Sequence, residues 1–237
     1  MEDKLAILQK NITEEVDIRL KEYVNTKQLV IPDDYDIESA MDYAWEELQN
    51  VEDIDHRQAL TICTKDSIVT SLLNMVVLGL NPAESECYFI VLHNKLLCQV
   101  SCAGIACITK RVANIKQFWV RVVYEDDEFE YTLSPVTAII KLSLKLANVK
   151  RDKIAAACAV VEWNGDKKDT IEIMTIDEIK KGWAHSKEFG FASSHHNMWP
   201  DQMAIRMIAN RICKPIINSS SDNELLKDAF YAVSEEI

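Results

Sequence analysis

The stretch "CYFIVLHNKLLCQV", residues 87–100, marks the point where the character of the chain changes. Two apolar runs, "CYFIV" and "LLCQV", flank "LHNK", and Asn94 suits a tight turn because Asn tolerates a positive φ. This pattern predicts a β-hairpin. Because helical periodicity dominates the residues before it, the hairpin predicts a mixed fold.

Apolar residues at helical spacing predict helices on both sides of this hairpin. One runs over about 37–48, and another over about 66–80, where "GLNP" stops it with Gly79 and Pro82. A short helix from about 104–112 follows the hairpin.

Two further hairpins are predicted in the centre of the chain. The strands "KQFWVRVVY" (116–124) and "EFEYTL" (128–133) surround the turn "EDD". The strands "IAAACAVVEW" (154–163) and "TIEIMT" (170–175) surround Asn164-Gly165.

The last third is again helical. "TIDE" is a capping box that opens a helix over about 175–186, and a loop, "FGFASSHHNMW" (189–199), follows. Pro200 suits the first position of a helix over 200–214, and a final helix fits 222–233. The order of helices, hairpins and helices predicts an α+β fold, with a central antiparallel sheet packed with helices and flanked by N- and C-terminal helical extensions.

Charge is distributed unevenly along the 237 residues. The formal net charge is −12, and residues 1–60 hold sixteen acids against six Lys/Arg. In contrast, residues 93–124 contain no acid and five cations, namely Lys95, Lys110, Arg111, Lys116 and Arg121. A basic groove can attract a polyanion locally, because screening limits the repulsion of distant acids to about 8–10 Å. We expect an acidic helical region (1–60) for oligomerisation or partner contacts, a core (61–217) and an acidic C-terminal tail (218–237).

Several classes of function lack their motifs. We find no signal peptide, membrane span, G-x-x-x-x-G-K-[ST] loop or G-x-G-x-x-G turn, which favours a cytoplasmic protein without ATP chemistry. The seven cysteines form no C-x-x-C pair and are expected to be reduced thiols rather than a redox or metal site. His195 and His196 have no spaced third ligand, so we expect them in a solvated loop.

The acidic turn leaves an enzyme as an alternative class. The carboxylates between Glu125 and Glu130 could serve a metal-dependent nuclease. However, consecutive residues on a strand point to opposite faces, which favours a solvated turn.

The remaining signals indicate a binding surface. In "KQFWVRVVY", the period of two places Trp119 and Arg121 on one face, where a ring can stack on bases and a guanidinium can meet phosphates. In the helix "PDQMAIRMIANRICKP", Arg206 and Asn210 share a face that is bordered by further cations, Arg211 and Lys214.

In this order, the motifs resemble the RecT family of phage-type single-strand annealing recombinases. The resemblance covers about 66–215 and rests on "GLNP", "HNK" with Gln99, "VVYEDDEFEY" and the late basic helix. The chain departs from the family pattern at Ala103, where a Lys is usual.

The resemblance implies an oligomer, as a ring or helical filament, that holds single-stranded DNA and lets a complementary strand pair. It implies no catalytic residue, no ATP and no metal site, with Mg²⁺ at most as a modulator. Single-stranded DNA, the annealed duplex, a partner exonuclease and a host single-strand-binding protein are the expected partners, in the cytoplasm of a bacterial host. An acidic protein-interaction module is a further alternative. The expected DNA-contacting residues are Lys95, Gln99, Lys110, Arg111, Trp119, Arg121, Lys150, Arg151, Lys153, Arg206, Asn210, Arg211 and Lys214.

Overall fold

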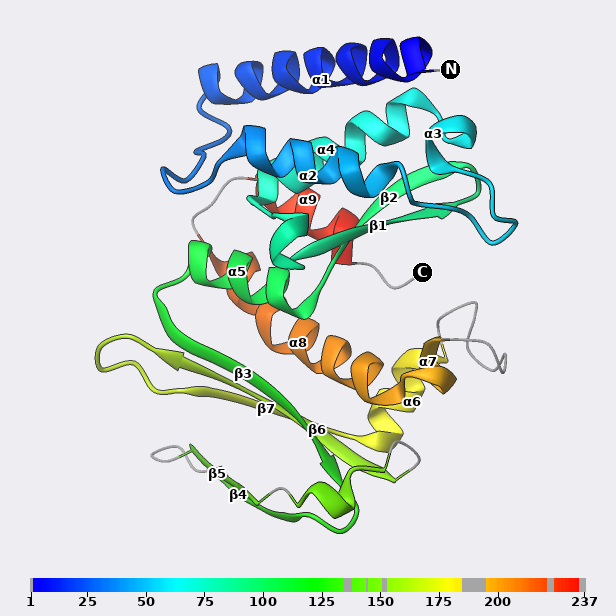
Figure 1. The fold of residues 1–237 in the computed structure, drawn as a ribbon. Coiled ribbons are helices and arrows are strands. Elements are labelled where there is room, and N and C mark those ends of the chain that lie inside the picture. Colours follow the sequence, from blue (N-terminus) through cyan, green and yellow to red (C-terminus); the bar gives the residue numbers. More distant parts are fainter. Residues whose placement is uncertain are drawn as a thin grey trace. The chain divides into compact units, whose positions relative to one another are not determined.

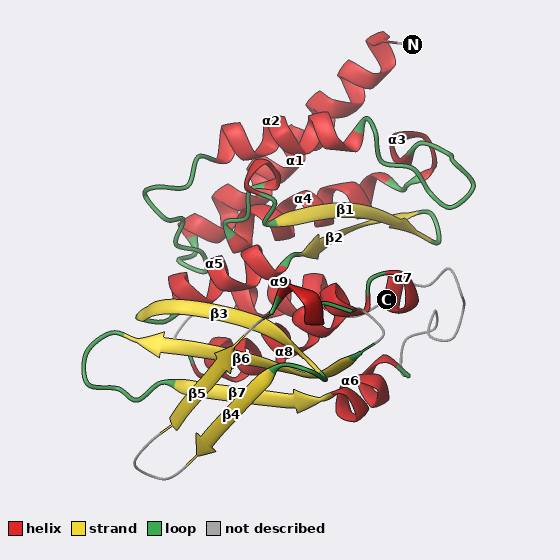
Figure 2. Cartoon of the chain, turned by 60° about the horizontal axis from the view of Figure 1, so that its bottom comes forward, coloured by secondary structure: helices red, strands yellow, loops and turns green. Residues whose placement is uncertain are grey.

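The computed structural model describes the chain except residues 1, 134–137, 144, 151–152, 185–194, 221–223 and 235–237. Its contacts divide the chain into two compact units (Figure 1). Unit 1 comprises residues 1–108 and 221–235, and unit 2 comprises residues 109–220 with the last two residues. The α+β class is confirmed, because helices and antiparallel strand pairs make up both units (Figure 2).

Unit 1 is built around the helix α4 (Lys65–Leu78), which is buried around most of its circumference. The elements packed with it are α1 (Glu2–Asn25), α2 (Ile37–Leu48), α9 (Glu224–Ser234) and a hairpin of β1 (Cys87–Leu92) and β2 (Lys95–Val100). The short helices α3 (Ala59–Ile62) and η1 (Pro82–Glu84) also belong to this unit. The predicted helices at 37–48 and 66–80 are thus confirmed, the second with small shifts at its ends. The predicted helix at 222–233 is confirmed from Glu224 on, and residues 222–223 lie outside the described part.

The first hairpin is confirmed, and its turn is the tightest that such a hairpin allows. His93 and Asn94 have φ of 50° and 59° and connect β1 directly to β2. Two consecutive positive φ values define a type I′ turn, whose twist matches that of the flanking strands.

Helix α4 covers the outer edge of β2 through two serines one turn apart. The Leu96 N–H donates to Ser67 Oγ at 3.0 Å, and Ser71 Oγ donates to the Leu96 carbonyl at 2.9 Å. These hydroxyls satisfy the main-chain groups that a further strand would otherwise bond. The hairpin is therefore fixed to α4 by hydrogen bonds as well as by apolar packing.

The N-terminal helix α1 packs on the same helix. Ile12, Val16 and Leu20 are buried at four-residue spacing, and Lys65 Nζ of α4 lies 2.8 Å from Glu15 Oε2. This Lys65 contact lowers the pKa of Glu15. The contacts thus place the start of the chain in one unit with α4. The functional role expected for that region is a separate matter and stays a prediction.

Unit 2 contains a three-stranded antiparallel sheet in the order β3-β6-β7. Its strands are β3 (Ile115–Tyr124), β6 (Ile154–Trp163) and β7 (Thr170–Thr175), and a separate hairpin is formed by β4 (Glu128–Leu133) and β5 (Ala138–Ser143). Its helices are α6 (Ile176–Trp183), α7 (His195–Met198) and α8 (Pro200–Ser219), with a 3-10 turn, η2 (Leu146–Asn148). Helix α5 (Cys102–Val112) begins in unit 1 and ends in unit 2.

The predicted pairing of β3 with β4 is wrong, whereas the pairing of β6 with β7 is confirmed. Strand β3 pairs with β6 instead, and β4 pairs with β5, a strand that the sequence analysis missed. The run from Ala157 to Val161 is buried on both faces, and its buried main-chain N–H and C=O groups need hydrogen-bond partners at each edge of β6. The ten-residue apolar β3 fills the edge left by β7, whereas β4 is short and carries two glutamates.

The capping box at Thr175 and Glu178 is confirmed, but α6 ends at Trp183, and residues 185–186 lie outside the described part. Residues 195–198 form a short helix instead of a loop, while the rest of the expected loop up to residue 194 lies outside the described part.

Helix α8 begins at Pro200 as predicted, yet it continues through Pro215 to Ser219, so the predicted end at Lys214 is wrong. Pro215 is exposed, while Ile216 and Ile217 are buried. Burial of these two apolar residues offsets the hydrogen bond that the proline removes.

Candidate nucleic-acid interface

The motif "GLNP" has a structural role in unit 1. Gly79 ends α4 in the left-handed region with φ of 65°, and Asn81 Oδ1 accepts from the Ala83 N–H at 3.0 Å. The Asn81 N–H donates to Glu86 Oε2 at 2.9 Å, and the Glu86 carbonyl accepts from the Ser101 N–H at 2.9 Å. The motif therefore connects the end of α4 to the start of α5.

Gly104 completes this connection. A Cβ atom at this position would lie 2.1 Å from the Glu86 carbonyl oxygen and 2.8 Å from Val100 Cγ2. Only glycine lets α5 approach the backbone this closely. The motifs "GLNP" and Gly104 thus position the hairpin and α5, which carry four of the expected DNA contacts.

On β2, Lys95 and Gln99 lie on the face opposite to that of Leu96, because residues two apart share a face. Lys95 is exposed, whereas Gln99 is only 3% exposed. Lys95 borders a hollow of about 440 Å³ between α4, β2 and α9. Hydroxyl and amide side chains line it from α4, namely Thr64, Ser67, Thr70, Ser71 and Asn74, together with Asp66. Lys95 is thus accessible to a phosphate, while Gln99 is not accessible in this conformation.

At the end of α5, Lys110 is exposed and Arg111 is half-buried. Both belong to the last turn, where cations also favour the helix dipole. Their position is compatible with a structural role and with a phosphate contact.

The two faces of the three-stranded sheet are distinct. Val120, Ala159 and Glu172 are direct partners across the sheet and so share one face. Helix α8 packs on the sheet, and Arg211 of α8 contacts Glu172, which identifies this face as the one that α8 covers. Trp119 and Arg121 therefore lie on the opposite face of the sheet from α8.

Arg121 and Trp119 are accessible on that second face. Arg121 is exposed and Trp119 is half-buried, and Arg121 Nη1 donates to the Val120 carbonyl at 2.7 Å. Cys158, the cross-strand partner of Arg121, is buried. Burial raises the pKa of its thiol to about 11, against a smaller opposing effect of the Arg121 charge, so Cys158 is protonated at neutral pH.

The expected contacts on α8 differ in their surroundings. Arg211 Nε lies 2.5 Å from Glu172 Oε1, an acid of β7 that the helix sequence does not reveal. Asn210 is only 7% exposed, and its Oδ1 accepts no hydrogen bond from the described residues. Arg206 and Lys214 are half-buried. Asn210 thus lies in the interior, although the sequence analysis placed it on an accessible face with Arg206.

The remaining expected contacts surround the start of β6. Lys150 is exposed, Lys153 is half-buried, and Arg151 lies outside the described residues. The Glu125 N–H donates to the Lys153 carbonyl at 2.9 Å, so the main chain at Lys153 holds the end of β3.

The acidic turn after β3 is held by its own hydrogen bonds. Asp127 Oδ2 accepts from the Tyr124 N–H at 3.0 Å, and Asn148 Nδ2 donates to Asp127 Oδ1 at 2.9 Å. Among the residues that the structure describes, no three His, Cys, Asp or Glu side chains are grouped to hold a metal ion. Asp127 thus has a structural role in redirecting the chain from β3 to β4.

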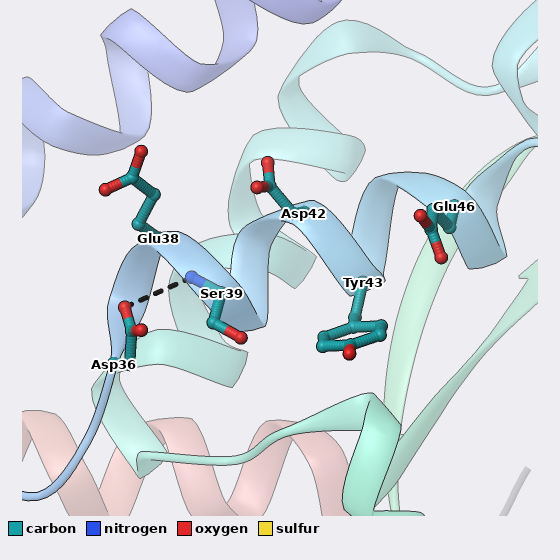
Figure 3. A pocket seen from close by; sticks show the side chains of 6 residues that line it. All are labelled: Asp36, Glu38, Ser39, Asp42, Tyr43 and Glu46. Carbon is teal, nitrogen blue, oxygen red and sulfur yellow. Dashed lines mark hydrogen bonds between the residues drawn. The ribbon is translucent and has the colours of Figure 1, made fainter.

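Acidic side chains line one face of α2 in unit 1 (Figure 3). Glu38, Asp42 and Glu46 follow one another at four-residue spacing, and Asp36 Oδ1 accepts from the Ser39 N–H at 3.1 Å. Tyr43, which is 46% exposed, lies beside them. This face presents negative charge to solvent.

Charge is segregated between the two units. Unit 1 contains 23 Asp/Glu and 9 Lys/Arg, whereas unit 2 contains 15 Asp/Glu and 17 Lys/Arg. The net negative charge of the chain therefore belongs to unit 1, whereas unit 2 carries slightly more Lys/Arg than acids. All the expected DNA contacts except Lys95 and Gln99 belong to unit 2.

A comparison with known protein families identifies the family of the chain. The sequence model described as the RecT family matches residues 38–236, which is most of the chain. The chain therefore belongs to the RecT family. This membership indicates a phage-type single-strand annealing protein of DNA recombination that binds single-stranded DNA. No curated protein matches the chain.

In the described part of the chain, no helix combines the length and apolar character that crossing a bilayer requires.

Proposed function

We propose that the protein assembles along single-stranded DNA and anneals it to a complementary strand without ATP. The family membership carries this proposal. Base pairing supplies both the specificity and the driving force, so the protein needs only to extend one strand and to reduce the repulsion between phosphates. No catalytic residue, ATP or resident metal is required, and Mg²⁺ acts only by screening the phosphates.

Unit 2 holds the DNA backbone in this proposal. Its 17 Lys/Arg exceed its acids, whereas the acids of unit 1 repel a polyanion and confine it to the basic unit. The phosphate contacts are assigned to Lys110 and Arg111 of α5 and to Arg206, Arg211 and Lys214 of α8. Lys95, beside the polar hollow, is the one contact assigned to unit 1.

In this proposal, the DNA strand follows α8 and does not reach the opposite face of the sheet. Trp119 and Arg121 therefore fall outside the path along α8, although the sequence pattern grouped them with its cations. Asn210 supports α8 from the interior instead of contacting the strand.

The acidic surface of unit 1 has a second role in the proposal. Its exposed carboxylates on α2 would contact partner proteins, of which an exonuclease and a host single-strand-binding protein are the expected ones, in the cytoplasm of a bacterial host. Residues 1–60 are also expected to contribute to oligomerisation, and α1 belongs to this region. If a deletion of residues 1–35 leaves assembly on DNA unchanged, α1 forms no subunit contacts.

A strand-annealing assay tests the proposal and separates it from a nuclease. Two complementary labelled oligonucleotides are mixed with the protein without ATP, with and without Mg²⁺. Paired product of full length, formed faster than without protein, supports annealing. Shortened product that requires Mg²⁺ and disappears in Asp127→Asn would support the nuclease instead.

A further inference from the structure

The hairpin of β4 and β5 stands apart from the other strands of unit 2. Among the described strands, β4 pairs only with β5, and β5 pairs only with β4. An isolated two-stranded hairpin is marginally stable in water, so partners at its edges would stabilise it. Each outer edge carries main-chain donors and acceptors that no described strand bonds.

One face of this hairpin is apolar. Phe129 pairs with Leu142 and Tyr131 pairs with Ile140, so these four side chains share a face. The rings of Phe129 and Tyr131 are 5.7 Å apart, and Tyr131 is 55% exposed. A neighbouring strand on either edge would extend this apolar layer.

The opposite face carries complementary charges at its two edges. On β4, Glu128 and Glu130 point to this face, and on β5, Lys141 and Ser143 do so. Strand β4 holds two acids and no base, whereas β5 holds one base and no acid. Glu128 is paired with Lys145 at 3.0 Å, while Glu130 and Lys141 form no ion pair with the residues that the structure describes.

We propose that the β5 edge of one copy pairs with the β4 edge of the next copy, so that the hairpins of successive subunits form a continuous antiparallel sheet. In this order, Lys141 lies between Glu130 of its own hairpin and Glu130 of the next copy. Pairing of two β4 edges would place glutamates side by side, and pairing of two β5 edges would place lysines side by side, so charge disfavours both symmetric dimers.

The contact is head-to-tail, because each subunit uses two different edges. Such a contact leaves one edge free at each end and repeats into a ring or a filament. It rests on the assembly proposed above and specifies the surfaces that form it.

Two charge reversals test the contact in the full-length protein. Glu130→Lys gives a protein whose two edges are both basic, and Lys141→Glu gives one whose two edges are both acidic. By sedimentation velocity, with and without a short oligo-dT strand, each variant alone should require roughly tenfold more protein than the wild type to assemble.

The mixture of the two variants is the decisive arm. The basic β4 edge of the first variant matches the acidic β5 edge of the second, and the unchanged edges match as well, so the equimolar mixture should assemble near the wild-type concentration. A folding defect within each hairpin would not be rescued by mixing. The double variant Glu130→Lys/Lys141→Glu should also assemble.

The contact is overturned if both single variants assemble like the wild type, if the mixture assembles no better than its components, or if the wild type does not assemble. Binding of a short oligo-dT by dilute protein is measured in parallel. Single variants that assemble and bind like the wild type sink the contact alone, whereas a wild type that binds no DNA sinks the proposed function.

Discussion

Arg211 Nε of α8 lies 2.5 Å from Glu172 Oε1 of β7, and this ion pair joins a candidate DNA-binding helix to the sheet beneath it. The side chains are 47% and 30% exposed, so water screens their attraction. A phosphate can therefore compete with the carboxylate for this guanidinium.

Glu172→Gln should tighten binding of single-stranded DNA, because it removes the competing acid. If Arg211 contacts a phosphate, the slope of log affinity against log salt should become steeper by up to about 0.7, the value for one phosphate contact on a single strand. Fluorescence anisotropy of labelled oligo-dT over a salt series measures both quantities.

The matched control is Asp169→Asn, which removes an exposed acid of unit 2 from the loop before β7. It should leave the slope unchanged. If Glu172→Gln behaves like this control, and Arg211→Ala also binds like the wild type, Arg211 serves only the packing of α8.

The two faces of the sheet give a second prediction. Arg206→Ala and Lys214→Ala should each weaken DNA binding and flatten the salt slope by about 0.7. Trp119→Phe and Arg121→Gln, on the opposite face, should leave affinity and slope unchanged. A loss of affinity in the second pair with none in the first would move the DNA to the face that α8 leaves uncovered.

The close approach at Gly104 predicts a large effect on folding. Gly104→Ala should lower the free energy of unfolding by about 1–3 kcal/mol, because its Cβ would overlap a backbone carbonyl that cannot move aside. Urea denaturation followed by circular dichroism measures the change.

Gly182→Ala is the matched control in α6. There, the added Cβ would meet the terminal methyl of Met207, a flexible side chain that can rotate away. Alanine also favours the helix by up to about 1 kcal/mol, so this variant should be close to neutral. Equal losses in both variants would contradict the role assigned to the Glu86 carbonyl.

The serines that cover β2 give a further prediction. Ser71→Ala should destabilise the protein by about 1–3 kcal/mol, because the buried Leu96 carbonyl would lose its donor. Thr70→Ala, at an exposed position on the same helix, should change the stability by less than about 0.5 kcal/mol. If the two variants are equally stable, another group or water bonds this carbonyl.

Local signals in the sequence predicted local structure well. The hairpin at 87–100, the helix at 37–48 and the capping box at Thr175 depend on residues a few positions apart. The partner of β3 could not be predicted in this way, because β3 and β6 are separated by a further hairpin and only the double-sided burial of β6 selects the pairing.

In the candidate site, too, the sequence predicted local features but not contacts between distant residues. The sequence identified the cations of α8, but not the acid that pairs with Arg211, because Glu172 lies 39 residues earlier on a strand. It likewise grouped Trp119 with α8, since spacing along one strand does not reveal which face a distant helix covers. The burial of Asn210 follows from packing on more than one side of α8, which one helical stripe does not show.

The central claim is that the cations of unit 2 hold single-stranded DNA for annealing. The most direct measurement compares ATP-free annealing rates of two triple alanine variants with that of the wild type. One variant removes three cations of unit 2, Lys110, Arg206 and Lys214. The other removes three exposed lysines of unit 1, Lys10, Lys21 and Lys27. We expect the first variant to lose most of its annealing and the second to keep the wild-type rate, with both folded by circular dichroism. Wild-type annealing by the first variant, or no annealing by the wild-type protein, would contradict the central claim.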